Sequence, residues 1–100
     1  MIQYRRRLYS TLQTQLKAQI ASEKLLVYSK EQCPFCVKAK KLLKDCNPTV
    51  VELSSLADGV ERQATLEKLT GQQTVPNIFI GGHHIGGHSD LVQGIKDGKV

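Results

Sequence analysis

Hydrophobic positions in the first half of the chain change from helical spacing to strand spacing and back. Leucine and isoleucine recur at every fourth position over 8–22, with glutamine and lysine between them, which predicts an amphipathic helix. The uninterrupted apolar run over 25–28 is typical of a strand buried on both faces. Proline is favoured at the first position of a helix, so Pro34 begins a second helix that Asn47-Pro48 ends. Its predicted apolar face holds Ala39, Leu42, Leu43 and Cys46.

The second half of the chain predicts two more helices and three more strands. Asp58 is placed to cap a helix that ends at Gly71. A last helix covers 88–97 and ends at Gly98. The strands cover 49–53, 75–80 and 83–85. The apolar face of the helix after Asp58 is expected to hold Val60, Ala64, Leu66 and Leu69.

This order of elements predicts a small mixed sheet covered by helices, in the α/β class. The first two strands are joined through a helix and should be parallel, whereas the tight turn at Gly81-Gly82 makes the last two antiparallel. A chain of 100 residues has room for one core, so residues 1–100 form a single domain. The composition, 40% hydrophobic and 23% charged, is that of a globular protein and excludes a disordered or fibrous chain.

The net charge of +5 is concentrated near the N-terminus. Residues 1–22 contain four basic residues and no acid, which leaves ten basic and nine acidic residues, or +1, in 23–100. This distribution argues against a nucleic-acid-binding surface over the whole domain. Residues 1–10 are expected to be a flexible or targeting extension, and 1–22 also has the composition of a mitochondrial transit peptide. We expect a cytoplasmic protein, with a mitochondrial location as the alternative.

Membrane and secretory signals are not expected in this chain. No apolar run approaches the roughly 20 residues that a membrane-spanning helix needs. The N-terminus has no apolar segment of the kind that secretory signals contain. Three cysteines, an odd number, also argue against the closed disulfide framework of a small secreted protein.

The strongest chemical signal is the CPFC segment, residues 33–36. It lies between a strand and a helix, so Cys33 is expected at the helix N-cap, where unpaired N–H groups and the helix dipole favour a thiolate. Such placement lowers a cysteine pKa, and the positive charge of Lys30 acts in the same direction. Cys36 lies one turn further into the helix and can attack a mixed disulfide formed at Cys33.

Zinc binding and burial in the core are the other roles open to the cysteines. A CxxC pair is also half of a zinc site, for which His83, His84 and His88 could supply nitrogen ligands. Neighbouring residues of a strand point to opposite faces, which disfavours a metal site that uses both His83 and His84, so no metal is expected. Cys46 is predicted to be a small buried hydrophobic residue rather than a redox group.

Three motifs in order resemble the glutaredoxins. They are Ser29-Lys30 before CPFC, the segment GQQTVPNIFI at 71–80 and the segment IGGHSD at 85–90. The resemblance covers about residues 11–100. It implies a thioredoxin-like fold, in which a four-stranded mixed sheet is flanked by helices. It also implies a cis peptide bond before Pro76, opposite Cys33.

The resemblance further implies a groove that binds glutathione. Lys30 and Gln63 would contact the glycyl carboxylate, and the backbone of Val75 would pair with the extended tripeptide. The first turn of the last helix would bind the γ-glutamyl end, with Asp90 on the ligand's amino group. Gln73 is neutral where many glutaredoxins have arginine or lysine. The expected contact residues are Lys30, Gln63, Gln73, Thr74, Val75, Pro76, Gly87, His88, Ser89 and Asp90.

The expected activity is glutathione-dependent thiol–disulfide exchange, in which Cys33 and Cys36 are catalytic and form a redox-active disulfide. Glutathione would be the co-substrate. The partners would be glutathionylated and disulfide-containing proteins, with no nucleic acid or membrane, and the chain would be a monomer. One alternative is a glutaredoxin that binds a [2Fe–2S] cluster with the help of glutathione, which Pro34 disfavours. The other is a thioredoxin-type reductant, which the absence of tryptophan disfavours.

Overall fold

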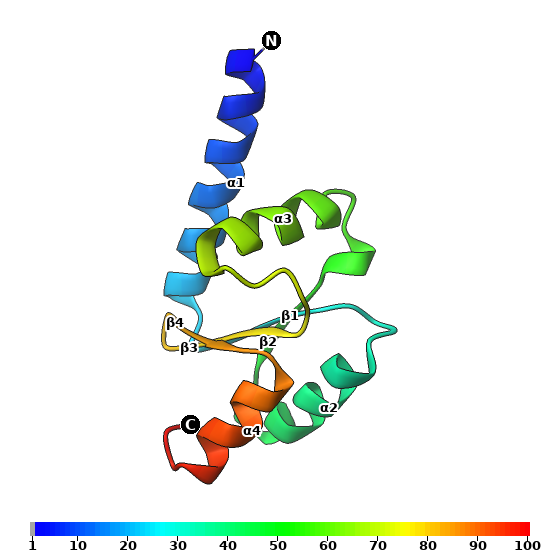
Figure 1. Ribbon diagram of the computed structural model, residues 1–100, viewed down its shortest axis with the longest axis vertical. Coiled ribbons are helices and arrows are strands. Elements are labelled where there is room, and N and C mark those ends of the chain that lie inside the picture. Colours follow the sequence, from blue (N-terminus) through cyan, green and yellow to red (C-terminus); the bar gives the residue numbers. More distant parts are fainter. Residues whose placement is uncertain (1) are drawn as a thin grey trace.

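The computed structural model describes the backbone of residues 2–100 and the side chains of residues 11–100. Its centre is a four-stranded sheet in the order β2-β1-β3-β4 (Figure 1). β1 pairs with β2 in parallel and with β3 in antiparallel, and β3 and β4 are antiparallel, which confirms the predicted mixed sheet. The strands are β1 (Leu25–Ser29), β2 (Thr49–Glu52), β3 (Asn77–Ile80) and β4 (His83–Gly86).

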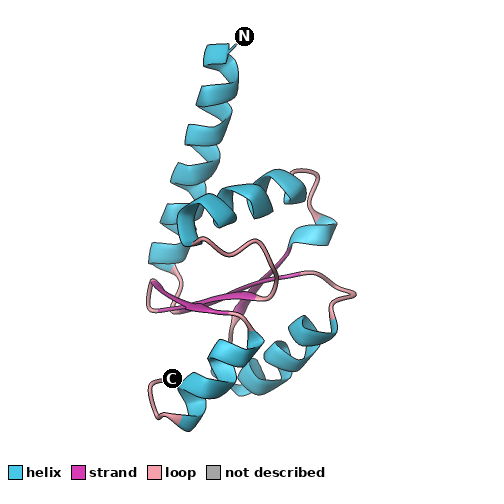
Figure 2. Cartoon of the chain, in the orientation of Figure 1, coloured by secondary structure: helices cyan, strands magenta, loops and turns pink. Residues whose placement is uncertain are grey.

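Helices cover both faces of this sheet in pairs (Figure 2). α1 (Ile2–Ser22) and α3 (Gly59–Thr70) lie on one face, and α2 (Pro34–Leu43) and α4 (His88–Lys96) lie on the other. Two short 3₁₀ helices, η1 (Lys44–Cys46) and η2 (Leu53–Ser55), precede and follow β2. Across residues 2–100, none of the helices has both the length and the hydrophobicity that crossing a membrane requires.

The hydrophobic core has two parts, one on each side of the sheet. Side chains of β1 alternate between them, since Leu26 and Tyr28 face α1 and α3 while Leu25 and Val27 face α2 and α4. All five residues of β1 are buried, as the apolar run predicted. Burying a large apolar side chain contributes about 1.5–3 kcal/mol, so this central strand anchors both layers. The other core residues include Leu16, Leu53, Leu66 and Phe79 on one side, and Ala39, Leu43, Ile78 and Leu91 on the other.

The first helix is longer than its apolar pattern predicted. α1 begins at Ile2 rather than at residue 8. Residues 2–7 contain no proline or glycine and three arginines, which are good helix formers, so the helix continues without an apolar stripe. Leu16 is fully buried and Ile20 packs against the core as expected, whereas the side chain of Leu8 lies outside the described residues.

Two predicted core positions at the end of α2 are wrong. Leu42 is 48% exposed and Cys46 is exposed. The α-helix ends at Leu43, and the tighter 3₁₀ turn that follows rotates Cys46 away from the apolar face. The face of α2 that packs on the sheet instead consists of Cys36, Ala39 and Leu43.

The apolar face predicted for α3 is also partly wrong. Val60 is 78% exposed and Ala64 is exposed, while Leu66 is buried and Leu69 is partly buried. Thr65 takes a buried position, because its hydroxyl donates to the Glu61 carbonyl at 2.8 Å and so leaves no polar group unpaired.

Asp58 occupies the N-cap position of α3, as predicted, but its side chain does not cap the helix. Its carboxylate accepts a hydrogen bond from Arg62 Nε at 2.9 Å instead. The side chain is therefore used in an ion pair one turn along the helix rather than on a backbone N–H.

The ends of three elements differ slightly from the prediction. β2 ends at Glu52, because Leu53 begins η2 and is buried between the sheet and α3. β3 begins at Asn77 rather than at residue 75, since Pro76 has no N–H to donate to a neighbouring strand. α4 ends at Lys96, one residue earlier than predicted.

Candidate functional site

Cys33 lies where the chain passes from β1 into α2. It is the N-cap residue of the helix, as predicted, and Pro34 is in the first turn. Its Sγ accepts a hydrogen bond from the Cys36 N–H at 3.4 Å, and its carbonyl accepts one from the Val37 N–H at 3.1 Å. The sulfur thus occupies the position that a capping oxygen takes in most helices, next to unpaired donors.

This position favours the ionised form of Cys33. Burial of the sulfur raises the pKa of Cys33, but hydrogen bonds from the thiol and N–H of Cys36 and from the Phe35 N–H lower it. The positive charge of Lys30 lowers the pKa further, so that the net shift is below the ordinary value of a thiol. Cys33 is half-buried, so a substrate can still reach its sulfur.

Cys36 has the opposite character. It is fully buried, and burial together with its hydrogen bond to Cys33 raises the pKa of its thiol. Hydrogen bonds with the Lys30 backbone and the Ser29 side chain offset only part of that rise. The surroundings of the two cysteines of the CPFC segment therefore act in opposite directions, because they favour the thiolate form of Cys33 and the thiol form of Cys36.

A cis peptide bond joins Val75 to Pro76 beside the reactive sulfur, which confirms the geometry that the sequence resemblance implied. The Cys33 thiol donates to the Val75 carbonyl, with 3.7 Å between sulfur and oxygen. This segment enters β3, the neighbour of β1, so the sheet places the two loops side by side. An extended ligand lying along Val75 would be in reach of the sulfur.

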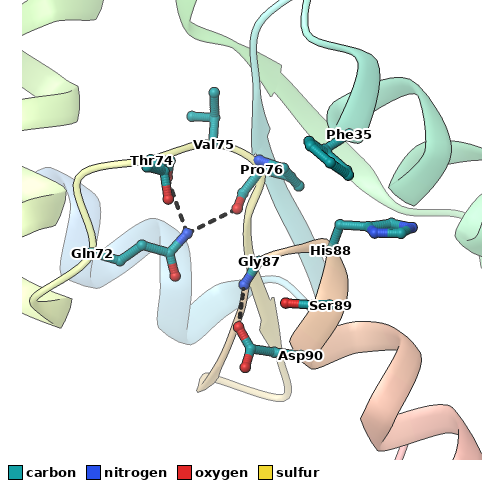
Figure 3. Close-up of a pocket in the computed structure, with 9 residues that line it drawn as sticks. All are labelled: Phe35, Gln72, Thr74, Val75, Pro76, Gly87, His88, Ser89 and Asp90. Atoms are coloured by element: carbon teal, nitrogen blue, oxygen red, sulfur yellow. Dashed lines mark hydrogen bonds between the residues drawn. The ribbon is translucent and has the colours of Figure 1, made fainter.

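A pocket of about 490 Å³ lies along this segment and ends at α4 (Figure 3). Its size is that of a site for a small ligand. The fold brings together seven residues that were predicted from two distant motifs. The pocket is lined by Thr74, Val75, Pro76, Gly87, His88, Ser89 and Asp90, together with Phe35 and Gln72.

The α4 end of this pocket is held by a capping interaction. Asp90 accepts a hydrogen bond from the Gly87 N–H at 2.9 Å, within the first turn of the helix. Gly86 turns the chain there with φ of +120°, and a Cβ on it would lie 2.4 Å from Asp90 Oδ2. Position 86 therefore requires glycine, because any side chain there would collide with Asp90.

Phe35 and Gln72 line the pocket but were not among the predicted site residues. The Phe35 ring is 55% exposed, lies 5.5 Å from the His88 ring and has Lys38 Nζ 5.2 Å from its centre. In the sequence, the signal that could have identified Phe35 is its place inside the CPFC segment, between the two cysteines. Gln72 has no sequence signal that separates it from Gln73.

Three predicted residues lie outside this pocket. Gln63 and Gln73 line an adjoining pocket, which Thr74 and Val75 also border, and Gln63 Nε2 donates to the Gln73 carbonyl at 2.7 Å. Lys30 lies with Cys33 in a further hollow. The predicted contact residues are thus divided among three pockets, two of which share Thr74 and Val75, and the Cys33–Val75 hydrogen bond links these two to the third.

Two of the three histidines contact neighbouring side chains. His84 lies 2.8 Å from the Asn77 side-chain oxygen and 5.1 Å from the Phe79 ring, and burial lowers its pKa. His88 lies against Phe35. Within the part of the chain that the structure describes, no three His, Cys, Asp or Glu residues are grouped so as to hold a metal ion.

Known proteins similar to this chain carry one family name. A family model described as Glutaredoxin matches residues 25–85. Glutaredoxin-C6 of Oryza sativa subsp. japonica is 46% identical over 86 residues, which are 84% of this chain and 77% of that protein. The structure of a buckwheat glutaredoxin–glutathione complex is 38% identical, with a TM-score of 0.86 over 91% of this chain and 84% of the other.

A further relative shows that the domain also occurs within longer proteins. Monothiol glutaredoxin-S12, chloroplastic, of Arabidopsis thaliana is 48% identical over 94 residues, or 91% of this chain. Those residues are 52% of that protein, so the chain spans about half of its length.

Proposed function

Because the chain belongs to the glutaredoxin family of glutathione-dependent oxidoreductases, we propose that it reduces protein–glutathione mixed disulfides and protein disulfides through Cys33. One observation carries the proposal. The Cys33 sulfur has a lowered pKa and lies 3.7 Å from the carbonyl of Val75, and Val75 lines a pocket of the size that a small ligand needs.

Removal of glutathione from a protein needs Cys33 alone. Its thiolate attacks the glutathione sulfur of the mixed disulfide, and a new bond forms between the two sulfurs as the old one breaks. The electron pair leaves with the protein sulfur, which takes up a proton from solvent. A second glutathione, as its thiolate, then attacks the glutathionylated Cys33, releases glutathione disulfide and restores the Cys33 thiolate.

Reduction of a protein disulfide requires Cys36 as well. Cys33 first forms a mixed disulfide with the protein substrate, and Cys36 must then lose its proton and displace the substrate's sulfur. Its raised pKa keeps it protonated until this stage, so it does not compete with Cys33. The resulting Cys33–Cys36 disulfide is reduced by two molecules of glutathione.

The groove has groups that suit both ends of a glutathione molecule, which supports glutathione as its ligand. Within the described residues the Val75 N–H makes no backbone–backbone hydrogen bond, so it can pair with the cysteinyl unit of an extended tripeptide. The glycyl carboxylate would lie towards Lys30, Gln63 and Gln73. The γ-glutamyl carboxylate would meet the N–H groups of His88 and Ser89, which begin α4.

The experiment that tests the proposal compares three cysteine variants. Cys33→Ser should abolish turnover of both a glutathionylated peptide and a protein disulfide, whereas Cys36→Ser should keep the first activity and lose most of the second. Cys46→Ser is the matched control, because Cys46 is an exposed cysteine outside the site, and it should keep both. Glutathione-coupled turnover that survived in Cys33→Ser would overturn the assignment.

Two further expectations from the sequence stay predictions. Cluster binding is the alternative function, and an absorption spectrum after anaerobic reconstitution with iron and sulfide would test it. A cytoplasmic location remains our proposal over a mitochondrial one, and the mass of the N-terminal peptide of the native protein would detect cleavage of a transit peptide.

A further inference from the structure

The side-chain amide of Gln72 has both of its N–H groups occupied. Its Nε2 donates to the Thr74 carbonyl at 3.0 Å and to the Pro76 carbonyl at 2.9 Å. A glutamine side chain has two N–H donors and one carbonyl oxygen. Because the protein uses both donors, Gln72 can offer a ligand in the pocket only its oxygen, Oε1, which accepts hydrogen bonds.

Asp90 lies at the same end of the pocket and, like Gln72, offers a ligand only hydrogen-bond acceptors. One oxygen of its carboxylate accepts from the Gly87 N–H at 2.9 Å, and the exposed side chain keeps acceptor capacity for a ligand. A Cβ on Gly87 would lie 3.9 Å from Asp90 Oδ2 and 3.9 Å from Gln72 Nε2, so the two side chains flank this glycine. Figure 3 shows the Gln72 oxygen turned away from the Thr74 and Pro76 carbonyls that the amide nitrogen bonds.

Backbone groups at the start of α4 supply hydrogen-bond donors at this end of the pocket. These donors are the N–H groups of the first turn of α4, at His88 and Ser89, where the helix dipole favours an anion. Acceptors thus lie on one side and donors on the other. This arrangement fits a zwitterion in which an ammonium and a carboxylate are attached to one carbon atom.

We propose that Gln72 Oε1 and Asp90 together accept hydrogen bonds from the α-ammonium of the ligand, and that Gln72 makes the groove select ligands that carry this group. An ammonium has three N–H donors, so a single carboxylate does not satisfy it in a partly desolvated site. The inference rests on the proposed function, since it identifies a specificity residue in the same groove.

The hydrogen bonds to Thr74 and Pro76 explain why Gln72 can serve this purpose. They fix the amide plane, so the oxygen is held in place before the ligand arrives and no rotamer freedom is lost on binding. A residue that only braced the turn would affect every ligand of the groove equally. A residue that accepts from the ammonium affects only ligands that have one.

The test compares two small mixed disulfides of the same thiol, one with glutathione and one with its des-amino analogue, glutaryl-cysteinyl-glycine. The measured quantity is the ratio of their kcat/KM values, in the wild type and in Gln72→Met, which removes the oxygen at similar side-chain length. Gln93→Met is the matched control, because Gln93 is an exposed glutamine of α4 that bonds Asp97 outside the pocket.

The wild type should prefer the glutathione disulfide, and Gln72→Met should lower that preference about tenfold, the size expected for one hydrogen bond to a charged group. Gln93→Met should leave the preference unchanged. If Gln72→Met slows both substrates by the same factor, the residue braces the turn and the inference is wrong. A wild type that reduces neither substrate would instead contradict the proposed function.

Discussion

Gly86→Ala is expected to weaken the site and the fold together, because of where its methyl group would lie. The new Cβ would be 2.4 Å from Asp90 Oδ2 and 2.8 Å from Asp90 Cγ, well inside van der Waals contact. Asp90 is short and is held by the Gly87 N–H, so it can move away only by giving up the cap of α4. In addition, φ of +120° is strained for alanine.

These two effects set the magnitude. A left-handed backbone costs an L-residue about 1–2 kcal/mol, and loss of a helix cap costs about 1 kcal/mol, so the free energy of unfolding should fall by about 2–3 kcal/mol. In a domain of this size 1 kcal/mol corresponds to about 4–8 °C, which places Tm about 10–20 °C lower. Displacement of Asp90 should also raise KM for glutathione.

Gly81→Ala is the matched control in the same hairpin. Gly81 also has a positive φ, of +57°, but a Cβ there would have nothing within 4 Å. It should therefore show only the backbone cost of about 1–2 kcal/mol and leave KM unchanged. Thermal unfolding followed by circular dichroism, with kinetics on the same samples, measures both. Equal losses of stability in the two variants, with KM unchanged in both, would refute the role given to the Gly86–Asp90 contact.

Three shorter predictions follow from the same structure. Lys30→Met removes a positive charge that lowers the pKa of Cys33, so the ultraviolet titration of its thiolate should move to higher pH; an unchanged midpoint would contradict this. Burial raises the pKa of Tyr28 to about 12, whereas an unfolded tyrosine ionises near 10, so the unfolded state loses its proton first and stability falls as pH rises between these values. Urea unfolding as a function of pH should show a shallower alkaline decline in Tyr28→Phe. In Cys46→Ser, iodoacetamide at mildly acidic pH should modify Cys33 before buried Cys36, as read by peptide mass spectrometry.

Local sequence was sufficient to predict the structure wherever the physical cause of that structure lies within one short segment. The buried run of β1, the proline that starts α2 and the glycines of the β3–β4 turn act through their own backbone preferences or apolar content, and each appears where it was predicted. The placement of Cys33 at a helix N-cap follows from the order of strand, CPFC and helix. For the same reason the direction of its pKa shift could be stated in advance.

Where several residues fit the same sequence pattern, only the tertiary structure decided which of them is buried in the core or lines the pocket. Leu42 and Val60 fit the helical periodicity of their segments but are exposed, because burial depends on where the sheet and the neighbouring helix lie. Gln72 and Gln73 have the same chemistry and adjacent positions, yet only Gln72 lines the pocket beside Pro76 and Asp90. The turn that begins at Gly71 makes that choice, since it sets the direction of each side chain relative to a helix more than ten residues away. Periodicity and motif spacing describe a single segment, whereas burial and ligand contact depend on the packing of several.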